Sequence, residues 1–252
     1  MGPAGEGETL SAPVFVAEGA DLAAETVVLS GAEGRHAATV RRIRPGERAD
    51  LTDGDGLVAE CEVSAVRAGE VELRVLRRRV EPLPQPRLVV IQAIPKGDRG
   101  ELAVETMTEV GVDVIVPWPA ARCVARWRAD RADKSLARWR SAARAAAKQA
   151  RRARIPEVTR PAATAEAARR AQAAACAVVL DQGAPRRLAE VPVPEGGEIV
   201  IVAGPEGGLT GEETAAFTGA GAARARLGPT VLRTSTAGAV AAAVLLSRSG
   251  RW

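Results

Sequence analysis

Hydrophobic and polar residues follow two different rhythms along this chain of 252 residues. Up to about residue 80, apolar and polar residues alternate with a period of two in short runs that are separated by turn residues such as 53–56, DGDG. Such alternation predicts half-buried strands that are joined by hairpins. We expect strands at 14–16, 27–29, 47–53, 57–66 and 70–80, and one helix at 33–43. Several short strands in so little chain favour a small β-barrel.

The second rhythm begins after the proline-rich segment 81–86, EPLPQP. From there, apolar runs without alternation take turns with segments of helical periodicity. Strands that are buried on both faces have this appearance, so the order predicts a parallel sheet covered by helices on both sides. The expected strands are 87–94, 113–118, 175–181, 198–204 and 223–228, and the expected helices are 98–112, 133–154, 164–174, 210–221 and 235–250. We therefore predict an α/β protein with two domains, 1–82 and 83–252.

Composition excludes several classes of protein. The three cysteines, Cys61, Cys123 and Cys176, lie far apart and the chain has a single histidine, so a Cys/His metal site is not expected. Isolated cysteines indicate a reducing compartment, and we predict a cytoplasmic protein. The longest apolar run, 237–246, is about half of what a membrane span needs, so no membrane association is expected.

Positive charge is concentrated in clusters although the net charge is only +4. Between Arg138 and Arg154 the chain carries seven positive side chains and no acid, and several of them share one face of the predicted helix. Shorter clusters include 41–44 and 77–79. A solvated helix face is one interpretation, and a surface for a polyanion is the other. Few aromatic residues are present for base stacking, so such binding would depend on phosphates and on salt.

The segment 199–213, IVIVAGPEGGLTGEE, places glycines between an apolar strand and a helix start. It contains neither the GxxxxGK[ST] phosphate loop nor the GxGxxG dinucleotide fingerprint. Thr210 and Glu213 have the spacing of a capping box. The glycines indicate either close approach of a ligand or a tight turn. Farther on, the helix predicted at 235–250 is apolar on nearly every side, so it should be buried in its own domain or against a second subunit.

The pattern GPEGG-L-T-x-x-E, followed by LG-x-x-x-LRT-x-TA at 227–237, resembles the SPOUT superfamily of RNA methyltransferases. Within it, the chain is similar to the bacterial 16S ribosomal RNA uracil-N3 methyltransferase family, through the segments 36–56, 94–124 and 146–158. The resemblance implies a PUA-like β-barrel at 1–82 that binds RNA and a SPOUT α/β domain with a trefoil knot at 83–252. Ser235 stands where many members of the family have glutamate.

The resemblance implies S-adenosylmethionine as the methyl donor, held by three loops. Glycines would let the backbone reach the polar edges of the adenine, while leucines would cover its flat face. The absence of a phosphate explains why no lysine follows the glycines. The implied donor-binding residues are Leu180, Gly204, Pro205, Glu206, Gly207, Gly208, Leu227, Gly228, Leu232, Arg233, Thr234 and Ala237.

The implied reaction is attack by uracil N3 on the donor methyl group, with loss of the N3 proton. Glu206 is a candidate base, although bracing the loop by accepting backbone N–H bonds is the role that we favour for it. Arg233 is expected to stabilise a uracil oxygen or to orient a substrate phosphate.

The implied partners are 16S rRNA in the small (30S) subunit and a second copy of the chain, with no DNA and no metal. Alternatives are a SPOUT enzyme for another RNA target or for a ribose 2′-hydroxyl, and a non-catalytic RNA-binding assembly factor. The residues expected to contact RNA are His36, Arg41, Arg42, Arg122, Arg140, Arg144, Lys148, Arg151 and Arg152.

Overall fold

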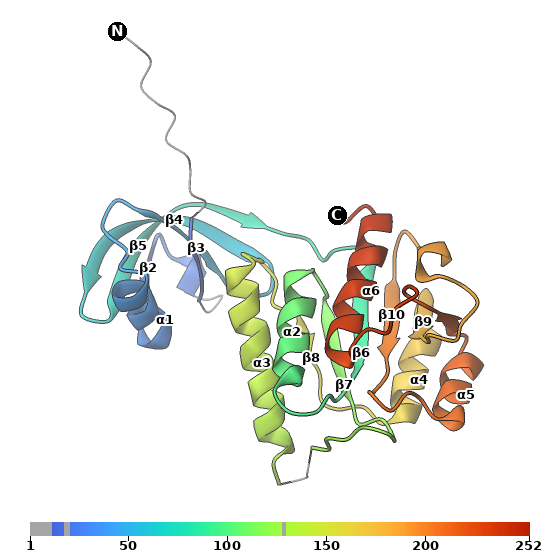
Figure 1. Ribbon diagram of the computed structural model, residues 1–252. Helices are drawn as coiled ribbons and strands as arrows, with labels where there is room; N and C mark the ends of the chain where they lie inside the picture. The colour runs from blue at the N-terminus through green and yellow to red at the C-terminus, as the bar shows by residue number, and fades with distance from the viewer. Residues whose placement is uncertain (1–11, 18–20, 128–129) are drawn as a thin grey trace. The chain divides into compact units, whose positions relative to one another are not determined.

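The structure is a computed structural model that describes residues 12–17, 21–127 and 130–252 (Figure 1). The chain divides into two compact units. The first comprises Met1–Pro82 together with Arg151–Arg154, and the second comprises Leu83–Ala150 and Ile155–Trp252. No helix among the described residues is long and apolar enough to cross a membrane.

A five-stranded sheet forms the body of the first unit, as far as the structure describes it. Its strands are β1 (Val14–Val16), β2 (Thr26–Leu29), β3 (Arg48–Thr52), β4 (Leu57–Arg67) and β5 (Glu70–Val80), hydrogen-bonded in the order β1-β3-β4-β5-β2. The period-two alternation is confirmed, because alternate residues such as Val71 and Leu73 are buried. The predicted helix is shifted toward the N-terminus. It consists of α1 (Gly31–Arg35) and a π-helical turn, η2 (His36–Val40). A short 3-10 turn, η1 (Asp21–Ala23), lies earlier in the chain, before β2.

The segment Arg151–Arg154 corrects the expected helix 133–154. Helix α3 (Ala132–Gln149) ends five residues earlier, and Arg151 adopts a positive φ of 55° that a helix cannot continue. The backbone is then held by the first unit, because Thr52 Oγ1 donates to Ala153 O at 2.8 Å. Arg154 donates to Glu81 O at 2.8 Å and pairs with Asp55 at 2.8 Å. These long-range contacts outweigh a helical propensity that is local and weak.

The second unit contains the predicted parallel sheet, in the order β11-β9-β10-β6-β7-β8. Its strands are β6 (Arg87–Ala93), β7 (Val114–Trp118), β8 (Glu157–Val158), β9 (Cys176–Leu180), β10 (Glu198–Ala203) and β11 (Ala223–Ala225). Every pairing in it is parallel. A 3-10 turn, η3 (Leu188–Glu190), precedes β10.

Helices cover both faces of this sheet, as predicted (Figure 1). Val90 and Ile201 belong to a core layer with α2 (Arg99–Glu109), α3 and α6 (Thr234–Arg248). Their strand neighbours Ile91 and Val200 belong to the opposite layer, which includes α4 (Thr164–Ala173) and α5 (Gly211–Gly219). The continuous apolar runs in the sequence therefore have the expected cause, burial on both sides. The trefoil knot stays a prediction of the resemblance.

Candidate functional site

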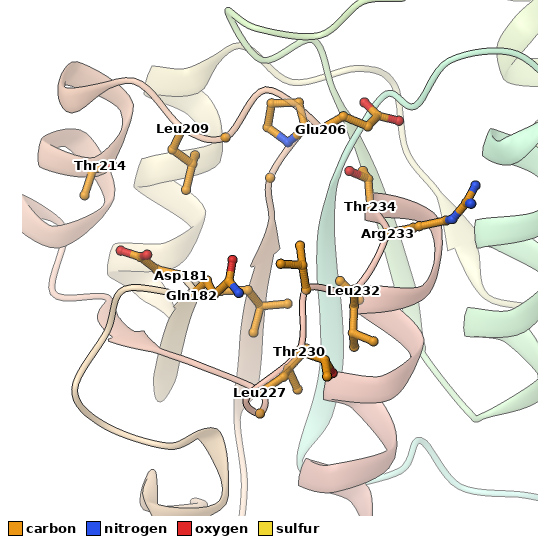
Figure 2. A pocket seen from close by; sticks show the side chains of 17 residues that line it. Asp181, Gln182, Glu206, Leu209, Thr214, Leu227, Thr230, Leu232, Arg233 and Thr234 are labelled. Atoms are coloured by element: carbon orange, nitrogen blue, oxygen red, sulfur yellow. The ribbon is translucent and has the colours of Figure 1, made fainter.

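Three segments meet around a cavity of about 600 Å³ at the carboxyl edge of the parallel sheet (Figure 2). They are residues 180–182 after β9, residues 204–209 after β10, and the segment 227–237 that leads into α6. β9 and β10 are neighbours, so the loops that follow them are brought together although they are far apart in sequence. Ligands of open α/β sheets bind at this edge.

The residues predicted to hold the donor surround this one cavity, with a single exception. Gly207 is not part of its wall. A Cβ atom at this position would lie only 3.1 Å from Cβ of Arg122, so any residue larger than glycine would require the segment of Arg122 to shift by a few tenths of an ångström. The predicted residues in the wall are Leu180, Gly204, Pro205, Glu206, Gly208, Leu227, Gly228, Leu232, Arg233, Thr234 and Ala237.

Sequence reasoning missed part of the wall. Asp181 was not missed, because it follows directly on β9 in the first of the three donor loops that the resemblance implies; its carboxylate accepts hydrogen bonds from Arg224 Nε at 2.6 Å and from Gly183 N at 2.9 Å. Other side chains lie in loops or in an otherwise ordinary helix and gave no signal. These residues are Gln182 and Thr214. Leu209, Thr230 and Val231 also line the wall, and they lie inside the recognised motifs GPEGG-L-T-x-x-E and LG-x-x-x-LRT-x-TA.

The capping box predicted at the start of α5 is confirmed. Thr210 Oγ1 accepts from Glu213 N at 3.1 Å, and Glu213 Oε2 accepts from Thr210 N at 2.9 Å. Glu213 is only 5% exposed, and its other oxygen accepts the N–H of Ala121 at 2.7 Å. The carboxylate therefore also joins the turn after β7 to the start of α5. The sequence pattern did not indicate this second contact.

Glu206 does not have the bracing role that the sequence favoured. Its side chain is exposed, and it extends away from Asp181 and Leu227 (Figure 2). Among the residues that the structure describes, no hydrogen bond or ion pair to its carboxylate is found. The loop is held instead by Glu213 and Arg122, and Glu206 is left available at the rim of the cavity.

The start of α6 is fixed by a hydrogen bond from Gln92 on β6. Its Nε2 donates to Thr234 O at 3.2 Å and to Ala93 O at 2.9 Å, while the side chain is fully buried. A glutamine inside the apolar run 87–94 was a signal that sequence reasoning passed over. Arg233 is the N-cap residue of α6, and its exposed side chain extends toward the same side as Glu206 (Figure 2).

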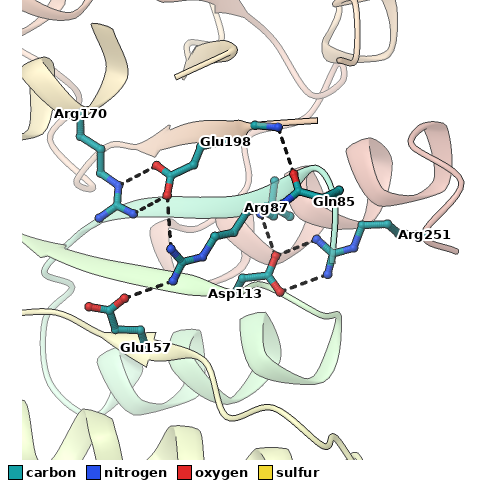
Figure 3. A network of polar contacts seen from close by, with 9 residues as sticks. Gln85, Arg87, Asp113, Glu157, Arg170, Glu198 and Arg251 are labelled. Carbon is teal, nitrogen blue, oxygen red and sulfur yellow. Dashed lines mark hydrogen bonds and ion pairs between the residues drawn. The ribbon is translucent and has the colours of Figure 1, made fainter. Parts of the chain in front are cut away.

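The other end of α6 is fixed by a polar network at the opposite edge of the sheet (Figure 3). Just beyond α6, the Arg251 guanidinium binds the Asp113 carboxylate through two hydrogen bonds, at 2.7 and 3.1 Å. Arg87 pairs with Glu157 at 3.2 Å, and with Glu198 at 3.6 Å. The helix that carries Thr234 and Ala237 is therefore anchored at both ends.

None of the three cysteines is among the described residues that line the cavity. Burial raises the pKa of the Cys61 thiol to about 11, and it also raises the pKa values of Cys123 and Cys176. All three are therefore protonated thiols near neutral pH, not thiolate nucleophiles. Among the described residues, no group of three or more His, Cys, Asp or Glu side chains is arranged to hold a metal ion.

The residues expected to contact RNA are divided between the two units. Arg140 and Arg144 are exposed on α3 and Lys148 is half-buried there, but Arg140 also donates to Val158 O at 3.0 Å. Arg151 and Arg152 do not extend this helix face, because they follow its end and belong to the first unit. The prediction that Arg151 and Arg152 share one helix face with Arg140, Arg144 and Lys148 is therefore wrong.

In the first unit, Arg41 and Arg42 are exposed after η2. His36 is half-buried, and its ring lies edge-on to Phe15 with 6.2 Å between the centroids. In the positive cluster 77–79, Arg78 donates a hydrogen bond to Leu22 O at 2.7 Å, so one of its three arginines is bound to the backbone of its own unit.

Arg144 is predicted to contact an RNA phosphate, so replacing it by alanine should weaken RNA binding several-fold and make the log–log slope of affinity against salt shallower by about one unit. Binding measured between about 50 and 200 mM salt tests this. Arg138→Ala is the matched control on the same helix, since Arg138 is already paired with Glu101 at 2.8 Å and should change the slope little. Equal slopes for wild type and Arg144→Ala would exclude a phosphate contact at Arg144.

Comparison with known proteins identifies the family. A sequence model of an RNA methyltransferase domain matches residues 81–246, and one of an RNA methyltransferase PUA domain matches residues 29–76. The ribosomal RNA small subunit methyltransferase E of Mycobacterium tuberculosis is 48% identical over 229 residues, covering 89% of this chain and 87% of that protein. The protein of the same name from Bacillus subtilis is 30% identical and covers 85% of this chain and 87% of its own length.

Solved structures agree with this result. A ribosomal RNA small subunit methyltransferase E from Neisseria gonorrhoeae, bound to S-adenosyl methionine, has a TM-score of 0.84 at 28% identity, covering 94% of this chain and 98% of that one. A putative methyltransferase from Legionella pneumophila, in complex with the cofactor SAM, has a TM-score of 0.85 at 27% identity, covering 95% and 98%. The resemblance found in the sequence is thus confirmed, and the chain belongs to the ribosomal RNA small subunit methyltransferase E family.

Proposed function

We propose that the protein transfers a methyl group from S-adenosylmethionine to N3 of a uridine in the 16S rRNA of the small ribosomal subunit, in the cytosol. The observation that carries the proposal is the convergence of three distant segments, 180–182, 204–209 and 227–237, on one cavity in a chain of this family. The relatives from Neisseria gonorrhoeae and Legionella pneumophila were solved with this donor, which supports the same donor here.

The cavity wall fits such a donor. Leu227 and Leu232 offer apolar surface for the adenine, and the glycine-containing loop 204–208 offers backbone groups for its polar edges. Because the donor has no phosphate, the wall needs no lysine, and no lysine is found among the described residues that line it. When bound, S-adenosylmethionine supplies the electrophilic methyl group.

Arg233 and Glu206 have complementary roles in the proposed reaction. The uracil oxygens gain negative charge as N3 loses its proton, and the Arg233 guanidinium stabilises that charge. Glu206 has an exposed carboxylate on the same side of the cavity and accepts the proton, directly or through a water molecule (Figure 2). Holding the two reactants in line supplies much of the remaining rate.

We expect Glu206→Gln to lower the rate of methyl transfer about a hundred-fold, because an amide cannot accept the N3 proton. The dissociation constant of S-adenosylmethionine, measured by calorimetry, should stay within about two-fold of wild type, since the side chain points away from most of the cavity. Glu212→Gln, an exposed acid a few residues away, serves as control. Loss of donor binding in Glu206→Gln would mean that Glu206 belongs to the donor site and is not the base.

A second copy of the chain is proposed as the partner of α6. On α6 the side chain of Val240 is 41% exposed and its neighbours Ala243 and Val244 are half-buried, and α2 adds Leu102 at 45% exposed. α2 and α6 pack against each other, so the two contributions come from adjacent helices. Sedimentation of Val240→Glu should give a monomer where wild type gives a dimer. A wild-type monomer would remove this part of the proposal.

Deleting the gene and mapping the modified uridines of 16S rRNA by mass spectrometry tests the function itself. One N3-methyluridine should disappear, and it should return when small subunits from the deletion strain are incubated with the purified protein and S-adenosylmethionine. Loss of a 2′-O-methyl group instead would assign the protein to a different acceptor atom. An unchanged rRNA would overturn the proposed function.

A further inference from the structure

The turn after β7, which contains Arg122, contacts the loop 204–209 that follows β10. Arg122 Nη1 donates to the carbonyl oxygens of Gly207, at 3.2 Å, and Leu209, at 3.4 Å. The backbones are close enough that a Cβ atom at Gly207 would lie 3.1 Å from Arg122 Cβ and 3.3 Å from Arg122 O. Two segments more than 80 residues apart in sequence are thus in direct contact at the edge of the cavity.

Glu213 holds the same turn from the other side. Its buried carboxylate accepts the N–H of Ala121, the residue that precedes Arg122, at 2.7 Å, and the N–H of Thr210 at 2.9 Å. Arg122 directly follows Ala121, whose N–H is held by Glu213, and its side chain contacts the carbonyl oxygens of the loop. The contacts form a closed arrangement in which α5 holds the turn and the turn holds the loop.

We infer that Arg122 is a positioning residue for the donor loop 204–209, and not the RNA contact that its charge suggested. Its guanidinium is directed at backbone carbonyls of the loop, and a single nitrogen, Nη1, donates to both of them. The inference deepens the proposed function, because the loop that it fixes forms part of the proposed donor site.

The loop needs an external brace because its own sequence provides little stiffness. Gly204, Gly207 and Gly208 are three of its six residues, and Gly208 adopts a φ of +71°. Glycine loses more conformational entropy on ordering than any other residue. If the loop were mobile before binding, the donor would have to order it, and the dissociation constant would rise accordingly. Arg122 lowers this cost by keeping the loop in its binding conformation.

Variants at two positions test the inference. Arg122→Ala should weaken S-adenosylmethionine binding about ten-fold in calorimetry, with Arg122→Lys in between because the lysine ammonium is a donor on a more flexible stem. Gly207→Ala should reproduce the loss without removing any charge, since the added Cβ forces the turn and the loop apart. Arg126→Ala is the matched control, because it removes an exposed arginine from the same segment. Its donor affinity should equal that of wild type.

RNA binding and loop mobility complete the experiment. RNA affinity at fixed salt should fall no more in Arg122→Ala than in Arg126→Ala. In the protein without donor, the amides of 205–209 should exchange hydrogen faster in Arg122→Ala and Gly207→Ala than in Arg126→Ala, at unchanged thermal stability. Weakened RNA binding with wild-type exchange and donor affinity would overturn the inference. Failure of the wild type to bind S-adenosylmethionine would contradict the proposed function, while the exchange rates would still decide the role of Arg122.

Discussion

Replacing Arg233 by alanine is expected to slow methyl transfer about a hundred-fold or more at saturating S-adenosylmethionine and RNA. Loss of one hydrogen-bond donor that stabilises the transition state typically has an effect of this size. The dissociation constant of S-adenosylmethionine should change by less than about three-fold. Arg233 is the N-cap residue of α6 without a side-chain capping hydrogen bond, and its side chain extends away from Asp181 and Leu227 (Figure 2). The guanidinium is therefore placed to act on the substrate more than on the donor. Single-turnover rates and calorimetry measure the two effects separately.

The alternatives for Arg233 differ in which constant changes. If it orients a substrate phosphate, the KM for RNA should rise while kcat is kept, and Arg233→Lys should restore most of the affinity. If it stabilises a uracil oxygen, kcat should fall and lysine should restore only part of it, because the fork is lost. A proportional loss of donor affinity and rate would contradict both roles and assign Arg233 to the donor site.

The fold followed from the sequence where burial decides the pattern. Runs such as IVIVA in β10 are apolar throughout because Val200 and Ile201 face opposite core layers, and local reading is then sufficient. Prediction from local sequence was wrong at 150–154, where arginine and alanine favour a helix but the helix has ended. The contacts that end the helix come from Thr52, Asp55 and Glu81, about 70 to 100 residues away in sequence, and no local pattern contains them.

The site was predictable as a set of segments but not as a set of interactions. The motifs at 204–208 and 227–237 could be recognised, and the structure brings them together. Charge alone made Arg122 an RNA residue, and loop position alone made Glu206 a brace. The contacts that hold this loop come from Arg122 and Glu213, and no local pattern contains them, because a side chain's partner depends on tertiary contacts. The RNA contact predicted for Arg122 is decided by the binding experiment on Arg122→Ala.

Arg251→Ala is expected to lower the free energy of unfolding of the second unit by about 3 kcal/mol, the usual cost of removing one partner from a buried ion pair. The Arg251 side chain is 14% exposed and that of Asp113 is 8% exposed, so the remaining carboxylate would stay away from water (Figure 3). Arg251 also donates to Pro86 O at 2.9 Å and Gly111 O at 3.2 Å, and these bonds would be lost as well. Urea unfolding followed by tryptophan fluorescence measures the change, because all four tryptophans lie in the second unit.

The contrast with an exposed pair makes this prediction specific. Arg138→Ala removes a pair with Glu101 whose arginine side chain is 58% exposed, and it should cost less than about 1 kcal/mol. Combining Arg251→Ala with Asp113→Asn should cost less than the sum of the two single changes, because the second change removes the charge that the first leaves buried. A loss for Arg251→Ala no larger than that for Arg138→Ala would show that α6 does not depend on this anchor. In that case the position of Thr234 and Ala237 at the cavity would be set by packing and by Gln92 alone.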